Sequence, residues 1–385
     1  MVEEVRAGPL DAIRVLDFTN MLSGPYCTRL LSDLGAEVLK IEPPGGDHNR
    51  GRRPLRDGHS SFFGHLNSGK KSVVLNLKSA TDRDAAIALA ATCDVVVENW
   101  RPGVAERLGV DYLSLREANS RLIYASISGF GQSGPDADRP AYAPILHAAT
   151  GYDLAQAQYQ GTNEPQRSGT FVADILGGLS AFAAIQTALY HRSVTGAGRY
   201  VDVSLMDCML NLMVNECQEG QAPSSREQRI YQPIRSSDGF VMIAPTSQRN
   251  FERLCDLVGH QEWLADPRFS TTLEREAHWT QLMQLVQAWT ESRTGEDCEA
   301  SFNAAGVPCA RYQTVMEAMF GPQTVHRRAL SQVTDPSGSY WVPNPPFKME
   351  GLDIRVASHV PALGEHTAEV FGQIEASGVR GDTVR

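Results

Sequence analysis

Cysteine pairs and histidine clusters are absent from this sequence. The seven cysteines never form a Cys-x-x-Cys pair, and the ten histidines include no His-Glu-x-x-His or comparable ligand cluster. The wide spacing and odd count of the cysteines argue against a disulfide framework and suit a reducing compartment. A metal site needs ligands at short, regular spacing. We therefore expect reduced, mostly packed thiols and no metal site.

Positive charge, a leader segment and long apolar runs are scarce as well. The 385 residues carry a formal net charge of -10, which argues against nucleic acid as the main partner, because phosphate binding needs a basic face. The stretch MVEEVRAGPLDAIRVL lacks a basic region followed by an apolar core, so secretion is not indicated. No apolar stretch approaches the length that spans a membrane. We expect a cytoplasmic protein without a membrane partner.

The N-terminal third of the chain instead alternates between apolar strands and helical segments. The predicted strands cover residues 13–19, 36–42, 72–78, 94–100 and 122–128, and the predicted helices cover 24–35 and 81–93. The second of these helices begins with a capping-box-like Thr81-x-x-Asp84. The βαβ rhythm predicts an α/β protein with a Rossmann-like parallel sheet and helices on both faces. Ligands bind such sheets at the carboxyl ends of the strands.

Composition changes along the chain predict a second, smaller domain. We expect a large domain at 1–216, completed by 345–385, and a small α+β domain at 235–325, where amphipathic helices follow a strand. The polar, irregular residues 217–234 are interpreted as a linker or lid. Residues 326–344 are interpreted as a return linker that runs into a segment rich in proline and glycine.

One carboxylate stands in an unusual place. The stretch GTFVADILGG, residues 169–178, sets Asp174 between small and apolar residues at the start of a helix that is apolar on most faces. A buried carboxylate is costly unless it is hydrogen-bonded or paired. From these residues alone two interpretations stay open. Asp174 is an ordinary helix N-cap, or it is a functional group to which Gly177 and Gly178 admit a substrate.

Two nucleotide-binding motifs are present only in part. GFGQSG, residues 129–134, follows a strand as a dinucleotide fingerprint does, but the prolines after it forbid the required helix. GHLNSGKK, residues 64–71, has the glycine and lysine spacing of a Walker A loop, yet Lys71 replaces the magnesium-binding Ser or Thr. Neither motif predicts a nucleotide site. The basic residues of the second motif remain candidates to contact another phosphate-bearing ligand.

Several segments, taken in order, resemble the class III coenzyme A transferases, a family that includes formyl-CoA:oxalate and carnitine CoA transferases. They are LDFTNMLSGPYCTRLLSDLGAEVLKIEPP, NSGKKSVVLNLK, VENWRPGVAERLG, SISGFGQSGP, FVADILGGLSA and LGEHT. Each segment alone is weak, but the ordered set covers roughly residues 10 to 375. The 2-methylacyl-CoA racemases are relatives of this family and resemble it in fold.

The resemblance implies that Asp174 is the catalytic carboxylate. It would carry CoA from an acyl-CoA to a small carboxylic acid through a mixed anhydride and an aspartyl-CoA thioester. CoA would then be a substrate, with no permanently bound cofactor. The residues that match the family's CoA-binding positions are Leu22, Ser23, Leu75, Asn76, Lys78, Asn99, Trp100, Arg101 and Arg107.

The predicted substrate pocket departs from the family's better-known members. Its candidate residues are Tyr142, His147, Gly131 and Gln132. Pro43 stands where formyl-CoA transferases have an arginine, Leu22 replaces a glutamine, Ala143 replaces a common Asp and His147 a frequent Gln. No Gly-Gly-Gly-Gly lid is present. These differences argue against oxalate or formate as the acid.

The racemases provide the alternative function. They carry their catalytic histidine at the position that matches Tyr142, so this chain lacks their base. His147 also precedes Asp174 in the chain, and it is expected to pack in or line the pocket rather than form an acid–base pair.

Two further expectations concern the acid and the assembly. The apolar Leu22 suggests an acyl group larger than formyl, and Arg226, Arg229 or Arg235 could pair with the distal carboxylate of a dicarboxylic acid. The chain leaves the large domain to form the small one and comes back through a Pro-rich segment. This organisation resembles that of the family's interlocked homodimers.

Overall fold

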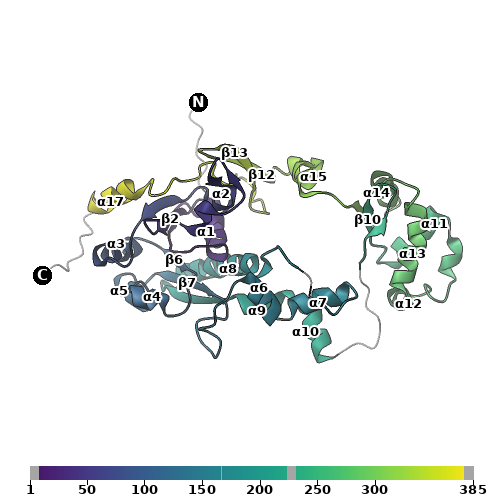
Figure 1. Cartoon of the computed structure of the whole chain (residues 1–385), viewed down its shortest axis with the longest axis horizontal. Coiled ribbons are helices and arrows are strands. Elements are labelled where there is room, and N and C mark those ends of the chain that lie inside the picture. Colours follow the sequence, from purple (N-terminus) through teal and green to yellow (C-terminus); the bar gives the residue numbers. More distant parts are fainter. Residues whose placement is uncertain (1–7, 166, 223–230, 377–385) are drawn as a thin grey trace. The chain divides into compact units, whose positions relative to one another are not determined.

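The computed structural model describes residues 8–165, 167–222 and 231–376 (Figure 1). The chain divides into two compact units, Met1–Val214 with Gln323–Arg385 and Asn215–Pro322. The first unit holds a parallel sheet, and the second holds a small antiparallel sheet with its own helices. Each unit is described by itself.

Six parallel strands form the sheet of the first unit. They are β1 (Arg14–Asp17), β2 (Glu37–Glu42), β5 (Lys71–Val74), β6 (Val95–Glu98), β7 (Ile123–Ser128) and β8 (Arg199–Ser204). Their order across the sheet is β5-β2-β1-β6-β7-β8, and every neighbouring pair is parallel. Numbered along the chain, this is the Rossmann order 3-2-1-4-5-6, with its switch point between β1 and β6. The expected parallel α/β architecture is confirmed.

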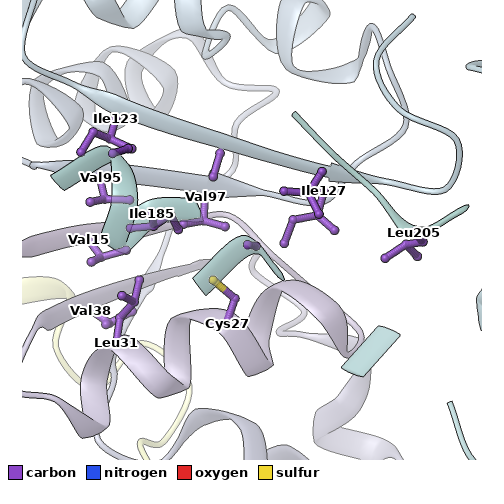
Figure 2. Packing of buried hydrophobic residues seen from close by; sticks show 14 of the residues in the cluster. Val15, Cys27, Leu31, Val38, Val95, Val97, Ile123, Ile127, Ile185 and Leu205 are labelled. Carbon is purple, nitrogen blue, oxygen red and sulfur yellow. The ribbon is translucent and has the colours of Figure 1, made fainter. Parts of the chain in front are cut away.

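Alternating side chains place the central strands between two apolar layers. Val15 of β1 belongs to one core cluster and Leu16 to the other, as do Val95 and Val96 of β6. This period of two is typical of strands. Figure 2 shows the first layer, in which Val15, Val38, Val95 and Val97 face Cys27, Leu31 and Ile185. Continuous apolar runs, rather than alternating polar ones, are what a sheet covered on both faces requires.

Helices cover both faces of the sheet and connect its strands. They are α1 (Ser23–Asp33), α2 (Ser61–Asn67), α3 (Ala80–Ala91), α4 (Val104–Leu108), α5 (Tyr112–Ala118), α6 (Ala143–Ala149), α7 (Tyr152–Tyr159), α8 (Val172–Thr195), α9 (Leu205–Leu212) and α17 (Thr367–Ala376). A 3-10 turn, η1 (His48–Gly51), and a two-stranded ribbon, β3 (Leu55–Arg56) with β4 (His59–Ser60), precede α2.

The start of α3 differs from the prediction. Its N-cap is Ser79, whose side chain accepts from the backbone N–H of Asp82, so the cap lies two residues before Thr81. Thr81 and Asp84 both lie inside the helix. A serine with a carboxylate three residues later fits the same capping pattern, and the predicted register was wrong by two residues.

Helix α8 corrects a second expectation. By length and composition it is apolar enough to cross a membrane, so the expectation that no stretch approaches that length was wrong. In this structure α8 packs against α1, α9 and the strands β7 and β8. A core helix of an α/β sheet meets the same compositional test. Ala181, Ile185 and Ala188 form part of its buried face.

The second unit is built on the antiparallel sheet β11-β10-β9, with β9 at Ile234–Arg235, β10 at Phe240–Ile243 and β11 at Cys309–Arg311. Its helices are α10 (Val214–Gln221), α11 (Gln248–Val258), α12 (Thr272–Ala277), α13 (Trp279–Thr290), α14 (Gly295–Ala304) and α15 (Val315–Phe320), with the 3-10 turn η2 (Gln261–Leu264). The first residue of α10, Val214, still belongs to the first unit. As the spacing predicts, Phe251, Leu254, Cys255 and Val258 are buried on α11.

The segment interpreted as a return linker has secondary structure of its own. After α16 (Pro322–His326), the strands β12 (Leu330–Asp335) and β13 (Gly338–Pro343) form a hairpin. Val333 and Val342 of this hairpin pack with Phe63 of α2 in a separate small core. The prolines and glycines mark the turn and the ends of the hairpin.

Candidate functional site

Asp174 lies in the first turn of α8, and amides from two other helices bind its carboxylate. Phe171 is the N-cap of α8, so Asp174 is the third helical residue, and the N-cap interpretation, one of the two that the sequence left open, was wrong. The backbone N–H groups of Ser23 and Ala143, the first residues of α1 and α6, donate to the Asp174 carboxylate. Amides at helix starts have no partner within their own helix and carry the positive end of the helix dipole. Three helix starts therefore converge on one carboxylate.

The electrostatics of this site make Asp174 unusual. Burial raises the pKa of Asp174 to about 6, while the two amides and the charge of Arg52 act in the opposite direction. Within the described residues the carboxylate forms no ion pair. At neutral pH the group is therefore ionised, poorly solvated and more basic than an ordinary aspartate.

His147 holds the N-terminus of α8. Its Nε2 accepts a hydrogen bond of 3.3 Å from the backbone N–H of Ala173, next to Asp174. The ring is 2% exposed and packs on Tyr152, with the ring centroids 5.3 Å apart. Burial lowers the pKa of His147, although the charge of Asp153 opposes this shift. Its Nε2 lone pair is occupied, so His147 positions the helix start and does not face Asp174 as a base.

The glycines after Asp174 serve helix packing, which corrects their predicted role. Both Gly177 and Gly178 are buried. A Cβ on Gly178 would lie 2.6 Å from the backbone oxygen of Ser23, and one on Gly177 would collide with the Leu205 side chain. The absence of a side chain lets α1 approach α8 closely, and this approach brings the Ser23 amide to Asp174. Gly178 therefore acts on the site through α1, whereas Gly177 makes room for Leu205 of α9.

The loops after β1 and β6, at the switch point of the sheet, lie next to the start of α1. The side chain of Asn99, after β6, binds the backbone of Asn20, after β1, through hydrogen bonds of 2.9 and 2.7 Å. Its Nδ2 also lies 3.4 Å from Ser23 Oγ. Met21 has a positive φ of 63°, and the buried Asn49 donates to its carbonyl. These contacts fix the turn that leads through Leu22, 7% exposed, into the start of α1.

A pocket of about 220 Å³ lies at the carboxyl ends of β1, β2, β5 and β6. Four residues predicted to bind CoA line it, namely Leu75, Asn76, Lys78 and Trp100. Leu75 is buried, Asn76 and Lys78 are exposed, and the Trp100 ring lies 5.4 Å from that of Phe18. The pocket thus offers an apolar, aromatic wall beside an accessible ammonium group, as a nucleotide-bearing ligand requires.

A comparison with known proteins identifies the family. The family model described as CoA-transferase family III matches residues 10–367. The chain belongs to CoA-transferase family III. The acetyl-CoA:oxalate CoA-transferase of Acetobacter aceti is 37% identical, with 90% of each chain covered. The succinate–glutarate CoA-transferase of Agrobacterium fabrum is 32% identical, with 96% of each covered. A CaiB/BaiF family protein from Brucella suis has a similar structure, with a TM-score of 0.83 at 32% identity over 96% of this chain and 100% of that one.

The enzyme is therefore a CoA-transferase, and enzymes of this kind use CoA thioesters as substrates. The racemase alternative is not favoured. Tyr142, the residue expected to match the racemase histidine, is a 62% exposed tyrosine that directly precedes Ala143. Among the described residues there is no cluster of His, Cys, Asp and Glu that could hold a metal ion.

The remaining predicted residues of the CoA-transferase lie elsewhere. Arg101 and Gln132 line a second pocket, of about 260 Å³, together with the buried Glu98. Gly131 has a positive φ of 87°, and the N–H of Gln132 donates to Asp202. Arg107 is exposed on α4. Among the contacts of the described residues, none joins this group to Asp174.

Lys70 of the Walker-like motif is not available to a ligand. It is 2% exposed, and its Nζ lies 3.0 Å from Asp17 Oδ2 and 2.7 Å from Thr28 Oγ1. The possibility that this lysine contacts a phosphate is therefore wrong. It belongs instead to a buried ion network beneath the β1 loop.

Of the three arginines considered for a distal carboxylate, Arg226 and Arg229 fall outside the described residues, as does part of the predicted lid. Arg235 lies in β9 of the second unit, with its guanidinium carbon 5.2 Å from the Phe240 ring centre. Arg52, whose charge acts on Asp174, was not among the residues predicted from the sequence. A signal existed in the arginine-rich stretch NRGRRPLR, which directly follows the loop after β2.

Proposed function

We propose that this CoA-transferase moves CoA from an acyl-CoA donor to a carboxylic acid acceptor through covalent intermediates on Asp174. The observation that carries the proposal is the environment of that carboxylate. It is ionised at neutral pH, buried enough to raise its pKa to about 6, and free of an ion pair within the described residues. A desolvated, basic carboxylate is a good nucleophile.

The first half of the reaction loads CoA onto the enzyme. An Asp174 oxygen attacks the thioester carbonyl carbon of the donor, the C–S bond breaks, and CoA leaves as its thiolate with a mixed anhydride on Asp174. The thiolate then attacks the Asp174 carbonyl carbon of the anhydride. The C–O bond to that carbon breaks, the donor acid leaves as a carboxylate, and an aspartyl-CoA thioester remains.

The second half reverses these steps with the acceptor. The acceptor carboxylate attacks the aspartyl thioester, expels the CoA thiolate and forms a new anhydride. The thiolate attacks the acceptor's acyl carbon and releases the new acyl-CoA and the free Asp174 carboxylate. No proton is gained or lost overall. Both intermediates keep a high group-transfer potential, which an ester on serine would not.

The amides of Ser23 and Ala143 suit this chemistry. They donate to the Asp174 oxygens in the free enzyme, and negative charge develops on those oxygens again in each tetrahedral intermediate that forms at the Asp174 carbonyl. Fixed donors of this kind stabilise such charge without reorganisation. The pocket that contains Lys78 and Trp100 is the proposed binding place for the nucleotide end of CoA.

The acid is proposed to be a dicarboxylate. The names of the two relatives describe transfer that involves oxalate in one and succinate and glutarate in the other. The apolar Leu22 next to Ser23 favours an acyl chain longer than that of oxalate.

Hydroxylamine trapping tests the mechanism. Hydroxylamine added during turnover with succinyl-CoA should convert the Asp174 thioester to a hydroxamate, detectable by peptide mass spectrometry on the FVADILGG segment. The enzyme without acyl-CoA is the control and should show no adduct. Continued transfer without any adduct on this segment would overturn the covalent mechanism.

We also propose an interlocked homodimer. Large apolar side chains are exposed on α8 and α9, and include Leu179, Tyr190, Val194, Leu210 and Leu212. These two helices pack together, and exposed apolar surface that is contiguous marks association sites. An obligate interface buries about 2,000–5,000 Å² or more. Light scattering should give the mass of a dimer, and a monodisperse monomer at micromolar concentration would contradict it.

A further inference from the structure

Arg52 has a setting that differs from that of its neighbours. It follows η1, and its guanidinium carbon lies 4.1 Å from the ring centre of Phe62 and 5.1 Å from that of Phe171. Phe171 is the N-cap of α8, three residues before Asp174. The charge of Arg52 acts on the Asp174 carboxylate. A guanidinium that packs against aromatic rings keeps its in-plane N–H groups free to bind a carboxylate with two hydrogen bonds.

Other arginines of the same loop are already occupied. Arg50, two residues earlier, also packs on a ring, that of Phe63, but it binds both oxygens of Glu42 at 2.7 Å. Arg56 packs on Tyr340 and binds Asp335 at 2.8 Å. Arg52 has the ring contacts without the carboxylate: within the described part of the chain its guanidinium forms no ion pair or hydrogen bond.

A half-buried cation without an anion is costly, and a bound anion would offset that cost. Asp174 itself does not supply the anion, because it acts on Arg52 without forming an ion pair. The phosphates of CoA are poor candidates, since the pantetheine arm separates them from the thioester carbon that Asp174 attacks. An anion beside the reacting carbon belongs to the acyl group.

We propose that Arg52 is a specificity-determining residue that binds the distal, unreacting carboxylate of a dicarboxylic acyl group. The inference rests on the proposed function of Asp174. In either mixed anhydride the acyl group of donor or acceptor is attached to the same Asp174 carboxylate. One arginine therefore serves both halves of the reaction, and it selects dicarboxylic half-thioesters and dicarboxylic acids alike.

The test compares matched substrates in the wild type, in Arg52→Gln and in Arg53→Gln. Arg53 is the exposed next residue and forms no ring contact or ion pair among the described residues. The substrates are succinyl-CoA and butyryl-CoA, which have acyl chains of equal length, each with the same acceptor. The quantity measured is the ratio of kcat/KM for the two donors, in which any general effect of Arg52 on Asp174 cancels.

Loss of a charge-assisted hydrogen-bond pair should lower this ratio roughly 10- to 150-fold in Arg52→Gln. Arg53→Gln should leave the ratio unchanged, and Arg52→Lys should restore part of it. An equal loss for both donors in Arg52→Gln would overturn the proposal and assign Arg52 to Asp174 or to the CoA phosphates. A wild type that prefers butyryl-CoA would overturn it as well.

The same reactions separate this inference from the proposed function. Hydroxylamine adducts on Asp174 are measured in each variant with both donors. Adducts in all variants together with an unchanged ratio would refute the role of Arg52 alone. Transfer without adducts in the wild type would refute the mechanism on which the role of Arg52 rests.

Discussion

Two carboxylates of the large unit, the buried Asp17 and the half-buried Asp174, lie in contrasting surroundings. Asp17, at the end of β1, accepts hydrogen bonds from the N–H and hydroxyl of Thr19, the hydroxyl of Thr28 and the ammonium of Lys70. Burial raises its pKa, yet Lys70, Lys40 and the hydroxyls together hold the pKa of Asp17 below its ordinary value. Asp174 has two amides and no ion pair within the described residues, and burial raises its pKa to about 6.

The difference separates a structural charge from a reactive one. Every lone pair of Asp17 is directed to a donor, so its negative charge stabilises the fold and is unavailable for chemistry. Asp174 keeps lone pairs that the described residues do not use, in a place where solvent stabilises them poorly. Burial alone does not mark a reactive carboxylate; burial with incomplete compensation does.

Removing the Asp174 charge should have the largest effect. Asp174→Asn keeps the shape of the side chain but cannot form the anhydride, so transfer should fall at least roughly 10³-fold. Asp207 offers a matched control, because it is the third residue of the neighbouring helix α9 and is exposed. Asp207→Asn should keep near-normal transfer. Initial rates of acyl-CoA exchange measure both, and an active Asp174→Asn enzyme would make Asp174 a structural group like Asp17.

Removing the lysine that pairs with Asp17 should lower the free energy of unfolding. Lys70→Met removes the ammonium group that is hydrogen-bonded to the buried Asp17 carboxylate, which costs about 3–5 kcal/mol of the free energy of unfolding. The adjacent Lys71 pairs with Glu37 and Glu369 in partly exposed contacts. Lys71→Met should therefore cost less than about 1 kcal/mol. Denaturant unfolding of both variants checks this, and equal losses would show that the buried network contributes no more than a surface pair.

The two carboxylates should also respond oppositely to pH. The pKa of Asp174 rises on folding from 3.8 to about 6, so folding takes up protons between these values and stability falls as the pH rises through this window. The full cost is about 3 kcal/mol at 1.36 kcal/mol per pH unit. Asp17, with a lowered pKa, contributes stability that is lost only as the pH falls below 3.8.

Comparing variants isolates this effect from other titrating groups. The difference in unfolding free energy between Asp174→Asn and wild type should move in favour of the variant from pH 4 to pH 8. Transfer by the wild type should decline as the pH falls through about 6, because the nucleophile becomes protonated. A stability difference that does not change with pH would mean that Asp174 is as well compensated as Asp17.

The smallest effect concerns the approach of α1 to α8. In Gly178→Ala the new Cβ meets the backbone oxygen of Ser23, which cannot rotate away. We expect a loss of about 1–3 kcal/mol in stability, with reduced transfer because the Ser23 amide is displaced. In Gly177→Ala the Cβ meets the end of the Leu205 side chain, which can change rotamer. This variant should keep more activity, and the reverse order would contradict the role of Gly178.

The parallel sheet and the unusual position of Asp174 could be predicted from the sequence. Apolar runs in the N-terminal third of the chain indicated the strands, since a sheet covered on both faces needs them, and the helices between them indicated a parallel sheet. The isolated Asp174 before two glycines stood out because it breaks an apolar pattern. These signals come from residues that are close together in the chain, so they can be recognised without knowing how distant segments pack.

The donors and cations around Asp174 could not be predicted in the same way. Ser23, Arg52 and Ala143 belong to separate segments that are distant from Asp174 in the chain, and they meet it only through the packing of those segments. The two glycines suggested a place where a substrate could approach the backbone, because the sequence does not show that α1 packs against Gly178 and that Leu205 of α9 packs against Gly177. For the same reason Lys70 resembled a phosphate ligand, although it pairs with Asp17.

The β5 edge of the parallel sheet is covered by residues that are synthesised last. β5 is an edge strand, and residues near the C-terminus cover it: the N–H of His366 binds the Ser72 carbonyl at 3.0 Å, and Thr367 Oγ1 accepts from the N–H of Val74 at 3.0 Å. On the ribosome, β5 emerges long before these partners, which lie near the opposite end of the chain. The nascent chain must therefore carry an uncovered strand edge, a site prone to pairing with other chains, through the translation of the entire second unit.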